Sequence, residues 1–163
     1  MDPSGATPAF EIDVADSQPR LAVDRAAVAA LVERVLRGEG VTTATISVAI
    51  VDDPTIHRIN RDHLGHDEPT DVVTFPLSEP GDDRLHGELV VSAETAARVA
   101  GELGVEPWNE LALYVVHGLL HLCGRDDLDE ASAAEMRRGE DEAMARVGLA
   151  NPFGASRRAG SRP

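Results

Sequence analysis

Apolar residues recur along this chain at two spacings, which alternate from segment to segment. An apolar residue at every second position, in a segment rich in Val, Ile and Thr, is typical of β-strands. Spacings of three and four residues are typical of helices that bury one face. The first pattern predicts strands at residues 10–14, 43–52, 71–76 and 87–92. The second predicts helices at residues 24–38, 53–64, 92–103, 107–123 and 128–147.

Residues that start and stop helices and strands support these boundaries. Asp24 and Ser92 are suitable N-caps, because their side-chain oxygens can accept hydrogen bonds from the first helical amides. Pro54 and Pro107 fit the first turn of a helix, where no backbone N–H is needed. Pro76 must end the third strand or place it at a sheet edge. The order of elements predicts an α+β fold, a small mixed β-sheet of about four strands packed with about five helices.

The length of the chain and the composition of its ends indicate one domain. With 163 residues, 42% of them hydrophobic, the chain suits a single core over residues 10–153. Residues 1–9 and the basic tail 154–163 are rich in small and polar residues, so we predict that both are disordered. No apolar run approaches the ~20 residues that cross a bilayer, and the N-terminus lacks the features of a secretion signal. A cytoplasmic protein with no membrane partner is therefore expected.

Charge and cysteine content narrow the possible partners and chemistry. The formal net charge is −14. This charge argues against nonspecific electrostatic binding of nucleic acid, and no DNA partner is expected. A metal ion can still bind phosphate locally against such a field. The single cysteine, Cys123, excludes an intramolecular disulfide. We interpret it as a small buried hydrophobe rather than a metal ligand.

Two histidines lie in an otherwise apolar segment, where their burial would be costly without partners. His117 and His121 are four residues apart, so on a helix their imidazoles stack on one face and can share a metal ion. Gly124 can take the left-handed conformation that reverses the chain and brings Asp127 back towards them. Two imidazoles and one carboxylate make a three-ligand site with a position open for water. The sequence therefore predicts a metal site on a helix that ends near Cys123.

A similar spacing occurs in zinc peptidases, which carry a general-base Glu directly after the first ligand His. Here that position is Gly118. The metal ligands of a zinc peptidase are present but its general base is absent, so a zinc peptidase is the weaker alternative.

The run from His117 to Asp127, His-Gly-Leu-Leu-His-Leu-Cys-Gly-Arg-Asp-Asp, resembles the H-G-x-L-H-L-x-G-y-D-H signature of the YbeY-type rRNA maturation factors. Residues 69–76 and 87–92 also fit this family, and the resemblance covers residues 41–153. It implies a zinc-dependent endoribonuclease, with one zinc ion per chain on His117 and His121, that hydrolyses single-stranded RNA. It also implies a role in rRNA maturation and ribosome quality control, with rRNA precursors, the small ribosomal subunit and assembly factors as partners.

Two positions depart from the family pattern. The family's third ligand His falls at Asp127, and its usual Arg before the loop glycine falls at Leu64. We keep His117 and His121 as ligands and take Asp127 as the replacement for the third. A carboxylate is an accepted zinc ligand, but it lowers the formal charge of the site from plus two to plus one. Both departures weaken the attraction for a phosphodiester and favour slower cleavage.

The mechanism expected from these residues is metal-assisted hydrolysis without a covalent intermediate. We take His117, His121 and Asp126 as the catalytic residues. Asp126 would act either as general base or as a group that orients an imidazole. The other candidate bases are Glu88, His63 and His66.

The missing family arginine leaves two questions open. Arg61 and Arg125 are candidate substitutes for its charge, although solvated surface positions are an equal alternative for both. The departures at Asp127 and Leu64 also favour an alternative hypothesis, that the protein is a non-catalytic ribosome-assembly factor. In that case it would bind RNA or ribosomal protein, and the metal would serve the structure alone.

Overall fold

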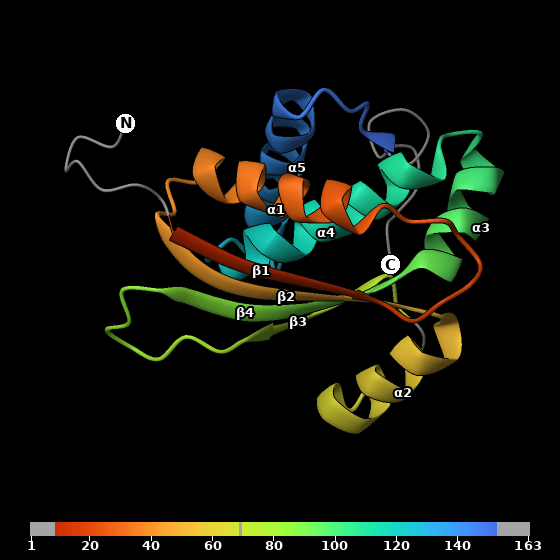
Figure 1. Cartoon of the computed structure of the whole chain (residues 1–163), viewed down its shortest axis with the longest axis horizontal. Coiled ribbons are helices and arrows are strands. Elements are labelled where there is room, and N and C mark those ends of the chain that lie inside the picture. The colour runs from red at the N-terminus through yellow and green to blue at the C-terminus, as the bar shows by residue number, and fades with distance from the viewer. Residues whose placement is uncertain (1–8, 69, 153–163) are drawn as a thin grey trace.

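The computed structural model describes residues 9–68 and 70–152. Its elements follow the predicted order (Figure 1): β1 (Ala9–Asp16), α1 (Arg25–Gly38), β2 (Thr43–Val51), α2 (Asp53–Leu64), β3 (Val72–Pro76), β4 (Leu85–Ser92), α3 (Ala93–Leu103), α4 (Pro107–Leu122) and α5 (Glu130–Arg146). The predicted α+β fold with four strands and five helices is confirmed over these residues. The segments predicted to be disordered, residues 1–9 and 154–163, lie outside the described residues, apart from Ala9, with which β1 begins.

The strands form one mixed sheet with the order β1-β2-β4-β3. β1 pairs with β2 and β2 pairs with β4 in parallel, whereas β3 runs antiparallel to β4. Parallel neighbours need a crossover; α1 makes the first, and the segment with α2 and β3 makes the second. β3 is therefore an edge strand that ends at Pro76, as the proline at this position led us to expect.

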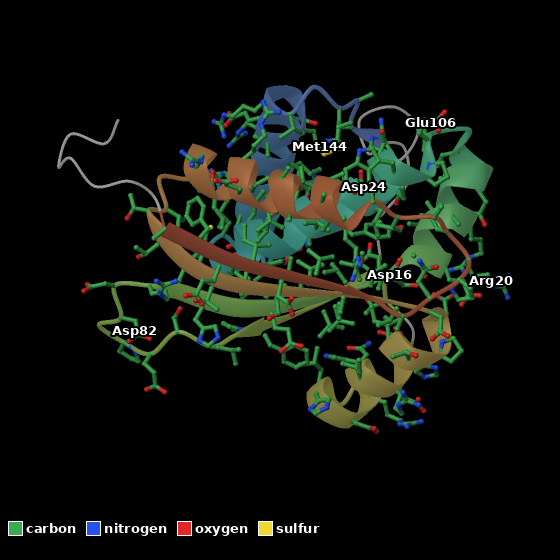
Figure 2. All side chains as sticks on the ribbon, viewed as in Figure 1. Asp16, Arg20, Asp24, Asp82, Glu106 and Met144 are labelled. Atoms are coloured by element: carbon green, nitrogen blue, oxygen red, sulfur yellow. The ribbon has the colours of Figure 1, made fainter. Side chains whose placement is uncertain are left out.

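Helices cover the two faces of the sheet unequally. α1 and α4 pack on one face, over the main core of Val, Leu, Ile and Ala side chains. The buried positions of β2 alternate, at Ala44, Ile46, Val48 and Ile50. On the opposite face lies α2 (Figure 1), over a smaller cluster of Val51, Ile56, Val73 and Val90. Figure 2 shows side chains filling the layer between the sheet and the helices above it.

The helices of this fold belong to that layered core. In the described part of the chain, none of them has both the length and the apolar composition needed to cross a membrane.

Two glycines let α4 lie directly on the sheet. A Cβ atom added at Gly118 would come within 2.7 Å of Leu89 Cδ2 and 3.1 Å of Thr74 Cγ2. At Gly87 of β4, an added Cβ would come within 2.6 Å of Leu122 Cδ1. Because these distances are shorter than van der Waals contact, larger residues would push the helix away from the sheet. The two glycines thus set the height of α4 above β3 and β4.

The carboxylate of Asp53 joins the starts of α2 and α3. It accepts hydrogen bonds from Ser92 Oγ at 2.7 Å, Thr95 Oγ1 at 2.5 Å and Arg98 Nη1 at 2.7 Å. Burial alone would raise the pKa of Asp53, but these hydrogen bonds together lower it below its ordinary value of 3.8. The ionised carboxylate therefore stabilises the junction of β4, α2 and α3.

We predict that Asp53→Asn lowers the free energy of unfolding by about 1–3 kcal/mol at pH 7, because hydrogen bonds to a charged group are lost. A carboxyl whose pKa is lowered by folding stabilises the fold above its unfolded pKa, and this contribution disappears as the pH falls through the folded value. The difference between the two proteins should therefore shrink below pH 3.8. Urea unfolding at a series of pH values measures it, and a difference that stays constant would contradict this role of Asp53.

A second prediction concerns the contact of α4 with the sheet. Gly118→Ala should lower the free energy of unfolding by about 1–2 kcal/mol even after the gain in helix propensity, because the added methyl group overpacks the contact with Leu89. Gly101 in α3 is the matched control, since an added Cβ there meets nothing within 4 Å. Gly101→Ala should instead stabilise the protein by up to about 1 kcal/mol. Equal effects of the two substitutions on urea unfolding would rule out the close contact.

Candidate metal centre

α4 carries both histidines that the sequence singled out. The helix starts at Pro107, as predicted, and most of its residues are buried against the sheet, α1, α3 and α5. His117 and His121 lie one turn apart where the packing is less complete, with side chains 15% and 27% exposed. One partly open face of a buried helix thus presents two imidazoles.

The chain reverses directly after α4. Gly124 has a φ of 99°, in the left-handed region that glycine adopts without strain. Its amide donates to the carbonyl of His121 at 3.0 Å. The next amide, of Arg125, donates to the carbonyl of Leu120 at 3.0 Å, which completes the pair of hydrogen bonds that closes such a helix end. The turn brings Asp127 back beside the histidines, as the position of the glycine predicted.

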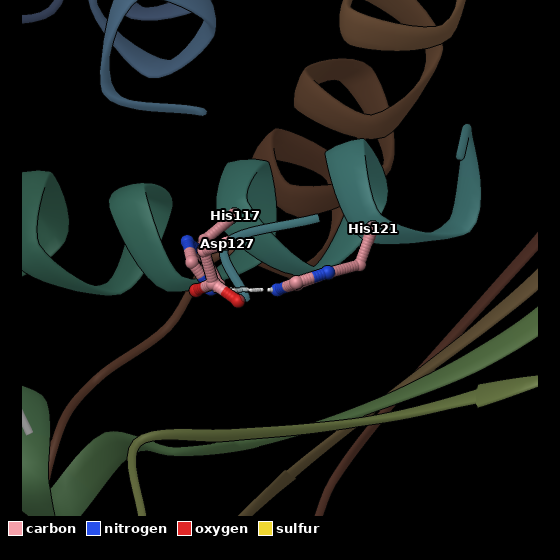
Figure 3. Close-up of side chains that lie close together, drawn as sticks. All are labelled: His117, His121 and Asp127. Atoms are coloured by element: carbon pink, nitrogen blue, oxygen red, sulfur yellow. Dashed lines mark hydrogen bonds and ion pairs between the residues drawn. The ribbon is translucent and has the colours of Figure 1, made fainter. Parts of the chain in front are cut away.

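Three side chains converge after this turn (Figure 3): those of His117, His121 and Asp127. The two Nε2 atoms are 3.0 Å apart, and Oδ2 of Asp127 lies 3.7 Å from each of them. Ligands at ~2.0–2.1 Å from a tetrahedral zinc ion stand about 3.3–3.5 Å from one another, so the observed separations bracket the required value. The three residues therefore form a group that can hold a metal ion. Asp127 is 42% exposed, which leaves that side of the group open to solvent.

A fourth residue, Glu140 of α5, contacts this group through His117. Its Oε2 lies 2.5 Å from Nδ1 of His117, the ring nitrogen that takes no part in the group of three donor atoms. Glu140 was not predicted as a site residue from the sequence, although its position contained a signal. It falls on the apolar face of α5, four residues after Met136 and four before Met144, both buried. An acidic residue in such a position requires a partner.

The surroundings of His121 favour its neutral form. Burial, together with the nearby His117, lowers the pKa of His121. A metal ion binds the neutral imidazole, because a proton would occupy the lone pair that the ion needs. Near neutral pH the histidine is therefore held in the form that a metal ligand requires.

The other candidate bases do not belong to the group of three donor atoms. Asp126 is exposed, and its Oδ1 accepts a 3.4 Å hydrogen bond from the backbone amide two residues later. His63 packs against Phe75 in a T-shaped pair, with ring centroids 5.8 Å apart. Glu88 is partly exposed on β4, and His66 is exposed after α2. The catalytic role of Asp126 stays a prediction.

The two arginines considered as substitutes for the family's Arg each form an ion pair. Arg125 binds Glu39 through two hydrogen bonds, Nε to Oε1 at 2.9 Å and Nη2 to Oε2 at 3.1 Å. Arg61 pairs with the adjacent Asp62 at 3.0 Å, and both side chains are half exposed. Leu64, at the family's Arg position, is 45% exposed. The charge of Arg125 is therefore balanced by Glu39, which leaves Arg61 as the more accessible cation.

Cys123 follows α4 directly and is partly buried. Burial, with a smaller contribution from Glu39, raises the pKa of its thiol to about 11. The thiol is therefore protonated near neutral pH, whereas a metal ligand is a thiolate. These properties agree with the interpretation of Cys123 as a small hydrophobe.

The close contact of α4 with the sheet bears directly on the peptidase alternative. Gly118 occupies the position of the peptidase's base, where even an added Cβ atom would come within 2.7 Å of Leu89 Cδ2 and 3.1 Å of Thr74 Cγ2. A Glu at this position would meet packed side chains rather than a water molecule. The fold thus has no room for a peptidase base there.

Residues 13–148 match the family described as Endoribonuclease YbeY. The chain belongs to this family. A protein named Endoribonuclease YbeY from Rhodopirellula baltica is 48% identical over 118 residues, which cover 71% of this chain and 60% of that protein. A protein of the same name from Carboxydothermus hydrogenoformans is 35% identical over 140 residues, which cover 84% of this chain and 97% of that protein. The family resemblance of the signature segment is thereby confirmed.

The fold is similar to a solved structure as well. The solution structure of TM1509 from Thermotoga maritima matches with a TM-score of 0.58 at 23% identity, over 93% of this chain and 99% of that one. At this identity the likeness supports the fold alone. The match to the Rhodopirellula baltica YbeY protein spans less than two thirds of that relative's length, whereas the match to the Carboxydothermus hydrogenoformans protein spans almost all of it.

We predict that the purified protein binds one zinc ion per chain and that His121→Ala fails to retain it, because one of three ligand atoms is lost. His86→Ala is the matched control, since His86 is exposed on β4 and lies outside the group. Elemental analysis after dialysis against zinc-containing and then zinc-free buffer measures the stoichiometry. A wild-type protein that retains no more zinc than His121→Ala would contradict the prediction.

Proposed function

We propose that this protein is a zinc-dependent endoribonuclease that hydrolyses single-stranded RNA. The observation that carries the proposal is the group of His117, His121 and Asp127, which lies within the segment matched to the family and has separations suited to zinc. The relatives' name, Endoribonuclease YbeY, supports the activity. The resemblance of the signature segment to rRNA maturation factors supports a single-stranded rRNA or rRNA precursor as the substrate.

We place this activity in small-subunit rRNA maturation and ribosome quality control in the cytoplasm, with the small ribosomal subunit and assembly factors as partners. The net charge of −14 disfavours tight binding to RNA in general. Contacts with a ribosomal particle would therefore have to bring the substrate to the protein. This requirement supports a role inside an assembly pathway over general RNA degradation.

In the proposed reaction the protein holds an ion and leaves one position open. Bound zinc would supply a polarised water molecule and a positive charge next to a phosphoryl oxygen. The ligand atoms would be Nε2 of His117, Nε2 of His121 and a carboxylate oxygen of Asp127. Asp126 is our candidate for accepting the proton of the attacking water, because it is exposed and adjacent to Asp127.

The proposed enzyme should be slower than relatives that have a third ligand His and the usual Arg. The carboxylate of Asp127 would offset one positive charge of the ion, which weakens its effect on bound water. Leu64 offers no charge to a phosphodiester, and the guanidinium of Arg125 is already bound by Glu39. Arg61 is also paired, with Asp62, but its side chain is half exposed, and it is our other candidate for a phosphate contact.

The second candidate function is a non-catalytic assembly factor in which the metal serves the structure alone, although the name of the relatives does not favour it. The specific observation is the ion pair of Arg125 with Glu39, which ties the arginine within the ligand segment to the end of α1. Under this alternative the protein would bind ribosomal particles without cutting RNA. The two functions are distinguished by activity rather than by binding.

The test is cleavage of a short labelled single-stranded RNA by purified wild-type protein, His121→Ala and His86→Ala. We predict cleavage by the wild type and by His86→Ala. We expect His121→Ala to lose more than the roughly 10–100-fold that follows from removing a group behind a metal ligand, because it removes a ligand itself. Residual cleavage by His121→Ala exposes any contaminating nuclease, since all three proteins are prepared identically, and His86→Ala controls for the loss of a histidine outside the site.

Each outcome of this assay favours one function. Loss of cleavage in His121→Ala alone would support the endoribonuclease. Equal residual cleavage by all three proteins, together with wild-type binding to ribosomal particles, would reject the endoribonuclease and support the assembly factor.

A further inference from the structure

Glu140 lies on a face of α5 that is otherwise apolar. The buried residues of this helix are Met136, Gly139, Glu140, Ala143 and Met144. The Glu140 side chain is 2% exposed. Removal of a carboxylate from water costs several kcal/mol unless a partner compensates it, so a Glu is retained in such a position only with a specific contact.

That contact is the imidazole of His117, with Oε2 of Glu140 2.5 Å from Nδ1. The His117 side chain is itself only 15% exposed, so the pair is shielded from water on both sides. A hydrogen bond between largely desolvated groups is stronger and better defined than one at the surface. The orientation of this ring is therefore set by α5 as well as by α4.

Gly139 allows α5 to approach closely enough for this contact. A Cβ atom added at Gly139 would come within 3.2 Å of Leu120 Cδ1 and 2.8 Å of Arg125 Nη1. A larger residue would have to displace these two side chains, or move α5 and with it the carboxylate of Glu140 away from α4. The small size of Gly139 thus allows the adjacent Glu140 to reach His117.

The carboxylate also decides which ring nitrogen of His117 carries the proton. When Nδ1 donates to this carboxylate, Nε2 keeps its lone pair. Nε2 is the atom that faces Nε2 of His121 at 3.0 Å and Oδ2 of Asp127 at 3.7 Å. The lone pair of His117 is therefore available in the middle of the group of three donor atoms.

We propose that Glu140 is a positioning residue of the metal centre, which holds His117 in the Nδ1-protonated tautomer and thereby aims its Nε2 lone pair at the ion. The inference rests on the proposed zinc site and adds a residue to it from a different helix. A carboxylate behind a ligand imidazole also increases the basicity of the ligand nitrogen. Glu140 contributes to metal affinity without touching the ion.

The first experiment compares zinc affinity in the wild type, Glu140→Gln and Glu135→Gln by competition with a chelator. Gln keeps the shape of the side chain but removes its charge, so Glu140→Gln should bind zinc roughly 10–100-fold more weakly. Glu135 is on the same helix, is 71% exposed and pairs only with Arg138 among the contacts described, so Glu135→Gln should bind as the wild type does. Thermal unfolding of the metal-free proteins separates this effect from a loss of stability. Unchanged zinc affinity in a folded Glu140→Gln protein would overturn the proposal.

The second experiment reads the tautomer of His117 in the metal-free wild type from long-range nitrogen–proton NMR correlations. The expected result is a proton on Nδ1, and a proton on Nε2 would overturn the proposal even if Glu140→Gln failed to fold. This measurement needs no metal. A protonated Nδ1 in a wild-type protein that does not bind zinc would therefore reject the zinc site while leaving the tautomer assignment intact.

Discussion

The packing of α4 on the sheet is the constraint on which the rest of this structure depends. At Gly118 the helix backbone approaches Leu89 so closely that a Cβ atom would lie 2.7 Å from its side chain. The contact fixes the rotation of the helix and, with it, the direction in which His117 and His121 leave the backbone. It also removes the space that an acidic residue would need at position 118. One packing contact thus supports the donor group and excludes the peptidase arrangement of the same histidines.

The boundaries of the elements were predictable because single residues set them. Asp24 and Ser92 cap α1 and α3 through hydrogen bonds to the first amides of each helix. Pro107 opens α4, and Gly124 reverses the chain after it. The same local rules predicted the group of three donors, since the spacing of two histidines and one turn glycine decides where Asp127 falls. Such determinants act within one or two helical turns, so a linear sequence contains them in full.

Contacts between distant segments were not predictable in this way. Glu140 meets His117 across 23 residues, and Arg125 meets Glu39 across 86. Neither pair has a characteristic spacing, because each depends on how α5 or α1 packs around α4. The apolar face of α5 indicated only that Glu140 needs a partner, and the tertiary structure supplies it. From the sequence, Arg125 was a candidate phosphate contact. In the structure its ion pair with Glu39 instead connects the turn after α4 to the end of α1.

The negative net charge of this chain is unlike that of a general RNA-binding protein. Its net charge is −14, the guanidinium of Arg125 is neutralised by Glu39, and Leu64 is uncharged. Two neutral imidazoles and one carboxylate would leave a bound zinc ion with a formal charge of plus one. Distant surface charges act weakly at physiological ionic strength, whereas an ion in contact with the substrate acts directly. In the proposed enzyme the ion would therefore be a main source of attraction for the phosphodiester, so that metal binding controls substrate affinity as well as reactivity.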